Sequence, residues 1–201
     1  MKQRSLGLPR HPTVAYLFLV RPMTRLATAL LFLASTSPLL AQYEIRKSSD
    51  GFLVVSNVPG RRFTLDVPGK QVTPYGAKTQ SHPYLTVDGV FLQILSVPLA
   101  EFNGDTGAGD ETVLRQQMHY EANYWKVPLS QIDSHTRKVG GRTTLVWSFT
   151  PRFSPRRVQQ VFLTLRSGSY VVVIGSAVQA GQRKTSIESL LARIAASFHA
   201  T

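Results

Sequence analysis

The alternation of apolar and polar residues predicts two strands early in the chain. Residues 63–67, FTLDV, show the period-two pattern of a strand with one buried face. Residues 51–57, GFLVVSN, form the second strand candidate. The preceding segment 43–50 is polar and carries no strand prediction. Residues 70–83 contain two prolines and little periodicity, so we expect a loop there.

The sequence YLTVDGVFLQILSVP, residues 84–98, predicts a hairpin. Asp88-Gly89 separates two apolar stretches, and this dipeptide suits a tight type I′ turn because both central positions need a positive φ. A single strand with a bulge is the alternative.

A helical spacing of apolar residues follows in residues 110–126. The apolar positions are Leu114, Met118, Ala122 and Trp125. Asp110 is a suitable N-cap because a carboxylate there accepts a hydrogen bond from the first turn. Val127-Pro128 predicts the end of the helix.

Four strand candidates separated by short turns come next. They cover residues 132–139, 143–149, 157–166 and 170–178. Such a succession predicts an antiparallel meander. Residues 170–174 are almost continuously apolar, which indicates a central strand covered on both faces.

The last segment, TSIESLLARIAASFHA, predicts a helix that lies on a sheet. Thr185 with Glu188 three residues later has the spacing of a capping box. One face of this helix gathers Ile187, Leu190, Leu191, Ile194 and Phe198. The order of elements therefore predicts a single α+β domain over residues 43–201, an antiparallel sheet flanked by helices.

Residues 1–42 have the order of a secretory signal. They hold five basic and no acidic residues, and an apolar run fills residues 26–41. Ser and Pro residues interrupt this run, so it is shorter than the roughly 20 residues of a membrane-spanning helix. We expect export, with cleavage near Ala41 and no stable transmembrane anchor; Met23 is a candidate start. The alternative is an amphipathic or disordered N-terminal arm.

The chain is basic, with 23 Lys and Arg against 11 Asp and Glu. Removal of residues 1–41 leaves 18 basic and 11 acidic residues, a net charge of +7. Such a charge favours anionic partners, namely lipid headgroups, envelope glycans or nucleic acid. Export makes nucleic acid the least expected of these. The chain has no cysteine, and a mature part of about 160 residues can bury a core without disulfides.

Several pieces of the sequence resemble the PsbP family, the extrinsic luminal proteins of photosystem II, and its bacterial relatives. The pieces are FTLDVP (63–68), VGGRTTLVWSF (139–149), QQVFLTLRSGSYVVVIGSAV (159–178) and SIESLLARIAASF (186–198). The resemblance implies an α/β/α sandwich, a fold shared with a small Ran-binding nuclear import factor. It also implies a non-catalytic binding or assembly role. Gly69-Lys70-Gln71 departs from the family, which often has a tryptophan there.

The candidates for catalysis and metal binding are weak in this sequence. Ser167 and Ser169 flank a glycine in a predicted turn, without the Gly-x-Ser-x-Gly motif of a hydrolase. The histidines His82, His119, His135 and His199 are scattered, and no His-x-x-x-His pair suits zinc. The loop NGDTGAGDE (103–111) offers oxygen ligands for calcium but lacks EF-hand spacing, and the start of a helix explains the same residues. We therefore expect no enzyme activity, no metal and no cofactor.

The segment FTPRFSPRR places arginines beside aromatic residues at a predicted hairpin tip. Its candidate partner-binding residues are Arg152, Phe153, Arg156 and Arg157. Arginine interleaved with aromatics suits a protein partner or an anionic surface, although a solvated loop has the same composition. The leading hypothesis is an exported, non-enzymatic binding protein that docks through this basic loop. The alternatives are a small-ligand or lipid carrier, with a groove beside Trp125 or Trp147, and a secreted hydrolase.

Overall fold

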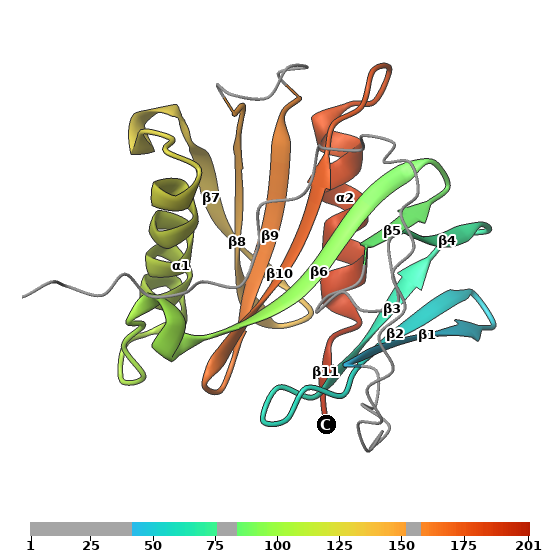
Figure 1. The fold of residues 1–201 in the computed structure, drawn as a ribbon, viewed down its shortest axis with the longest axis horizontal. Coiled ribbons are helices and arrows are strands. Elements are labelled where there is room, and N and C mark those ends of the chain that lie inside the picture. Colours follow the sequence, from blue (N-terminus) through green and yellow to red (C-terminus); the bar gives the residue numbers. More distant parts are fainter. Residues whose placement is uncertain (1–41, 76–83, 152–157) are drawn as a thin grey trace, which may run out of the picture. The chain divides into compact units, whose positions relative to one another are not determined.

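Two antiparallel sheets and two helices make up the described part of the chain (Figure 1). The structure is a computed structural model that describes residues 42–75, 84–151 and 158–201. These residues belong to one compact unit, Thr36–Thr201. The antiparallel α+β class predicted from the sequence is confirmed, but the strands divide between a four-stranded and a seven-stranded sheet.

The smaller sheet has the strand order β1-β2-β3-β11. Its strands are β1 (Tyr43–Ser48), β2 (Gly51–Ser56), β3 (Phe63–Pro68) and β11 (His199–Ala200). The strand β1 falls in the polar segment for which no strand was expected. It is an edge strand paired with β2 along its whole length, and its Tyr43 and Ile45 side chains pack against the core, an alternation too short to predict a strand from the sequence.

The larger sheet has the order β4-β5-β6-β10-β9-β8-β7. Its strands are β4 (Val72–Tyr75), β5 (Tyr84–Val87), β6 (Val90–Pro98), β10 (Tyr170–Ala177), β9 (Gln160–Ser167), β8 (Arg142–Phe149) and β7 (Asp133–Val139). The predicted meander is confirmed, and β10 is central and buried throughout. The loop expected over residues 70–83 is wrong at 72–75, where β4 pairs with β5 at the sheet edge, a position that tolerates proline.

The predicted hairpin turn at Asp88-Gly89 is confirmed. Both residues have a positive φ, 46° and 81°, as the type I′ turn requires. The Asp88 carboxylate also accepts hydrogen bonds from the backbone N–H groups of Lys70, at 3.1 and 3.2 Å, and Gln71, at 2.9 Å. These bonds attach the segment before β4 to the β5–β6 turn.

The two α-helices cover opposite faces of the larger sheet. Helix α2 (Lys184–Ala196) packs in a core between this sheet and the smaller one, to which β9 and β3 contribute. Helix α1 (Asp110–Tyr124) and the short 3-10 helix η1 (Leu99–Phe102) cover the other face, against β8 and β9. A second 3-10 helix, η2 (Leu129–Gln131), leads into β7. Figure 1 shows α1 and α2 on either side of β8 and β9.

Both predicted helix caps are wrong in detail. The N-cap of α1 is Gly109 and that of α2 is Arg183, and neither makes a side-chain capping hydrogen bond. Asp110 is instead the first helical residue, where its charge still suits the helix dipole. Glu188 lies 3.5 Å from the ammonium of Lys184, so it takes part in an ion pair one turn away rather than in a capping box.

Candidate functional site

The predicted partner-binding residues Arg152, Phe153, Arg156 and Arg157 lie outside the described residues. The two strands that this segment joins are described. Phe149, the last residue of β8, pairs with Gln160, the first residue of β9. The arginine-rich segment therefore connects two neighbouring strands, as expected, and the surroundings of its two ends are known.

An aromatic stack leads from the core to this end of the sheet. Phe162 and Trp147 stack with ring centroids 4.2 Å apart, and Phe149 stacks with Trp147 at 5.9 Å. Trp125, just after α1, packs on Phe149 at 5.8 Å, and Tyr124 meets Trp125 edge-on at 6.1 Å. The stack thus runs from buried Phe162 to Tyr124, whose exposed fraction is 42%.

Helix α1 ends beside this stack in a Schellman motif. The N–H of Val127 donates to the carbonyl of Ala122 at 2.9 Å, and the N–H of Lys126 to that of Asn123 at 3.1 Å. Lys126 occupies the left-handed position of the motif, with a φ of 53°. Glycine is favoured there because it has no Cβ. The chain therefore holds an exposed lysine at a backbone position that disfavours it.

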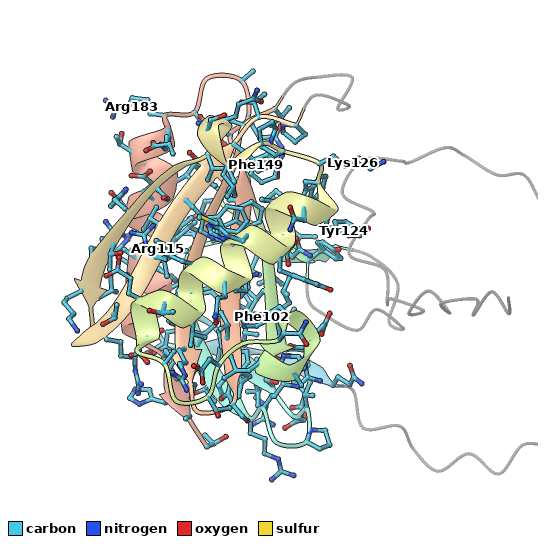
Figure 2. All side chains as sticks on the ribbon, turned by 90° about the vertical axis from the view of Figure 1, so that its left-hand side faces the viewer. Phe102, Arg115, Tyr124, Lys126, Phe149 and Arg183 are labelled. Atoms are coloured by element: carbon cyan, nitrogen blue, oxygen red, sulfur yellow. The ribbon has the colours of Figure 1, made fainter. Side chains whose placement is uncertain are left out.

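Two exposed apolar side chains, Tyr124 and Leu129, lie within three residues of Lys126 in the sequence. Leu129 is 49% exposed, and together with Tyr124 it makes up the large exposed hydrophobic residues of the described part of the chain. We call Tyr124, Trp125, Lys126 and Leu129 the α1-end patch; Figure 2 shows Tyr124 and Lys126 at this end of the helix. The sequence analysis missed this patch, although the helix-ending Val127-Pro128 marked its place.

A buried carboxyl group lies one turn inside the same end of α1. Glu121 is 7% exposed and its Oε1 accepts a hydrogen bond from the Gln117 side-chain amide at 3.3 Å. Burial, and then the charge of Glu101, raise the pKa of Glu121 to about 7. The indole N–H of Trp147 is also buried and has no hydrogen-bond partner among the described residues. Polar groups as well as apolar side chains are thus buried where α1 covers the sheet.

The loop considered for calcium is held by an arginine of the chain itself. The Arg166 guanidinium donates to the carbonyl oxygens of Ala108 at 2.6 Å and Thr106 at 2.7 Å, and lies 3.8 Å from the Asp110 carboxylate. The Asp105 carboxylate accepts the N–H of Gly107 at 2.8 Å. Over residues 42–75, 84–151 and 158–201, no three His, Asp or Glu residues gather as a metal site would require.

The space beside Trp147 is filled by side chains. Trp147 is 1% exposed and is in stacking contact with Phe162. Neither Trp125 nor Trp147 lines any of the three pockets identified within the described residues. The pocket expected there is thus not among those identified, and the larger two lie beside α2.

Two adjoining pockets form a groove between α2 and the turns of both sheets. Their volumes are about 530 and 400 Å³, and Pro68, Asp88 and Arg193 line both. The turn between β1 and β2 closes one end, and the segment before α2 closes the other. We call this the α2 groove.

Comparisons with known proteins give no family for this chain. No protein-family model matches the chain, and no curated protein matches its sequence. Neither α-helix of the described part is long and apolar enough to cross a bilayer.

Among solved structures, the fold is similar to that of cyanobacterial PsbP (CyanoP) from Synechocystis, with 11% identity and a TM-score of 0.45 over 84% of this chain and 99% of that chain. A protein from Bacteroides thetaiotaomicron gives 10% identity and a TM-score of 0.45 over 69% of this chain. This chain spans 45% of the length of the Bacteroides protein. A PsbP structure is thus among the solved structures to which this chain is similar.

Proposed function

We propose that this chain is an exported, non-catalytic binding protein that docks onto an anionic envelope surface or partner through the α1-end patch and the arginine-rich segment 152–157. One observation carries the proposal. The aromatic stack of the core ends at the surface in Tyr124, next to Lys126, and its member Phe149 stands three residues before Arg152. Trp125, which lies between exposed Tyr124 and Lys126, thus packs on Phe149, and the sequence continues from Phe149 into the arginine-rich segment.

The chemistry of this end suits an anionic, partly apolar partner. Tyrosine and tryptophan present an apolar ring with a polar atom, and lysine and arginine combine apolar stems with cationic heads. Tyrosine and tryptophan are enriched at membrane–water interfaces, and tyrosine, tryptophan and arginine are enriched where proteins meet other proteins. The net charge of +7 after residue 41 adds long-range attraction to an anionic surface.

Export accounts for residues 1–42 in this proposal. A basic start followed by an apolar run supports a cleaved signal, and the first strand begins at Tyr43, two residues after the expected cleavage at Ala41. The mature domain would then be residues 43–201. The intact mass of protein recovered from the periplasm of an expressing bacterium tests the cleavage.

The docking proposal is tested by removing the arginines. The variant Arg152→Ala/Arg156→Ala/Arg157→Ala is compared with Arg46→Ala/Arg62→Ala/Lys138→Ala, which removes the same charge from exposed positions elsewhere. Flotation with vesicles of phosphatidylglycerol and phosphatidylcholine measures surface docking, and crosslinking in the host envelope measures capture of a protein partner.

We expect the first triple variant to lose docking by about tenfold or more and the control to lose far less, with unchanged melting temperatures. Equal losses in both variants would mean that only net charge matters and would remove the segment from the proposal. Unchanged docking of the first variant would do the same.

A further inference from the structure

The α2 groove has walls that glycines allow to approach closely. A Cβ on Gly51, whose φ is 153°, would meet the Val67 carbonyl oxygen at 2.3 Å. A Cβ on Gly69 would meet the Val87 side chain at 2.5 Å. Because the Asp88 carboxylate also binds the backbone of Lys70 and Gln71, the turns that line the groove are joined to one another. The groove is therefore a preformed feature of the domain.

Four cations line the groove without a partner in the described part of the chain. Lys47, Lys70, Arg183 and Arg193 make no ion pair and no side-chain hydrogen bond with described residues. Lys184, the neighbour of Arg183, shows the contrast, because it pairs with both Asp133 and Glu188.

The acidic residues of the groove only partly offset this charge. They are Asp50 and Asp88. Asp88 is already engaged with two backbone N–H groups. The balance of the groove is cationic, and its cations remain available to a ligand.

The remaining lining combines small polar side chains with flat apolar ones. Ser48, Ser49 and Ser186 offer hydroxyl groups, and Phe52 and Pro68 offer apolar surfaces. The Gln182 amide is already bonded to the Gln179 N–H and the Gly89 carbonyl. The volumes of about 530 and 400 Å³ fall in the usual range of ligand sites, about 300–1,000 Å³.

An acyl chain is a poor fit for this groove. Of the aliphatic residues that line it, Val87, Ile187 and Leu190 are at most 7% exposed and Val90 alone is half-buried, so they offer little surface to an acyl tail. Hydroxyl-bearing sugar rings, in contrast, match polar side chains interspersed with flat apolar ones.

We propose that the α2 groove binds an acidic oligosaccharide, whose carboxylates lie against Lys47, Lys70, Arg183 and Arg193. The sugar hydroxyls would bond to the serine side chains, and the ring faces would lie on Phe52 and Pro68. This site is distinct from the α1-end patch, because α1 and α2 cover opposite faces of the larger sheet. The inference does not rest on the docking function.

The test uses hexagalacturonate as the probe and a neutral maltohexaose of the same length as its control. Isothermal titration calorimetry on the purified protein should show binding of the acidic sugar that weakens with added salt, and binding of the neutral sugar at least about tenfold weaker. Equal affinity for both sugars, or no binding of hexagalacturonate at low salt, would overturn the proposal.

Matched double variants locate the site. Lys70→Ala/Arg193→Ala should weaken hexagalacturonate binding by about tenfold or more, whereas Arg62→Ala/Lys138→Ala, with the same loss of charge, should change it by less than about twofold. The charge-conserving Lys70→Arg/Arg193→Lys variant should keep most of the affinity, and it provides a folded comparison if the alanine variant loses stability. Equal losses in both alanine variants would refute a groove site.

Anionic vesicles distinguish a lipid headgroup from a glycan. If the groove variant loses phosphatidylglycerol vesicle binding but keeps hexagalacturonate binding, the groove is a headgroup site and the glycan proposal is wrong. If the groove variant loses hexagalacturonate binding but still docks on the vesicles, the proposal is supported.

Discussion

Lys126 at the end of α1 gives a test in which stability and binding should change in opposite directions. Its φ of 53° places a residue with a Cβ in the left-handed region, which costs such a residue roughly 1 kcal/mol relative to glycine. The Schellman bonds of Lys126 and Val127 come from backbone N–H groups, so Lys126→Gly retains both. We therefore expect the free energy of unfolding to rise by about 1 kcal/mol, less the added entropy of glycine in the unfolded chain.

The gain in stability is measurable by thermal and urea denaturation. For a domain of this size, about 1 kcal/mol corresponds to a rise in Tm of roughly 2–4 °C. The Lys126→Ala variant is the control, because it removes the same charge and keeps the Cβ. It should show no comparable gain in Tm.

The docking assay should separate charge from conformation. Both Lys126→Gly and Lys126→Ala remove one cation from the α1-end patch, and both should weaken flotation with phosphatidylglycerol vesicles. If Lys126→Gly is not more stable than Lys126→Ala, the strain attributed to this position is wrong. If both variants dock as well as the wild type, Lys126 has no part in binding.

Two further predictions concern buried charge. The pKa of Glu121 is raised to about 7, so the folded protein keeps a proton that the unfolded chain releases from about pH 4.5 upward. The free energy of unfolding should therefore fall as the pH rises from about 4.5 to 7 and change no further above pH 7. Glu121→Gln should remove this pH dependence and raise the free energy of unfolding on the order of 3 kcal/mol at pH 8, measured by urea unfolding of variant and wild type. A gain of the same size at pH 4 would show that the raised pKa of Glu121 is not the cause. Arg166→Met should release the carbonyl oxygens of Thr106 and Ala108 and so speed amide hydrogen exchange in residues 103–110. Exchange at the wild-type rate would show that this loop does not depend on the Arg166 guanidinium.

Local patterns predicted the elements whose conformation depends on residues close in sequence. The Asp88-Gly89 turn, α1, α2 and the meander from β7 to β10 lie close to where periodicity and turn residues placed them. Both helix caps were wrong because several residues near a helix start can serve the same role, and the choice depends on the path of the preceding chain.

Strands at sheet edges were the main omission in the fold. The apolar alternation of β1 is limited to Tyr43 and Ile45, and β4 contains a proline. Each owes its conformation to the hydrogen-bond ladder of one neighbour, β2 or β5. A pairing of this kind is a property of two segments, and neither segment shows it alone.

The candidate sites divide in the same way. The sequence by itself showed a basic protein with an export-type start and an arginine-rich connection between two strands, because these are properties of composition and short segments. Only the tertiary structure placed Lys126 in a left-handed conformation beside the aromatic stack and brought Lys47, Lys70 and Arg193 to one groove. These residues are far apart in the sequence, and residues 47, 70 and 193 come together only when both sheets pack around α2. Burial of apolar side chains drives this packing, and the hydrophobic pattern does not indicate which exposed charges it will bring together.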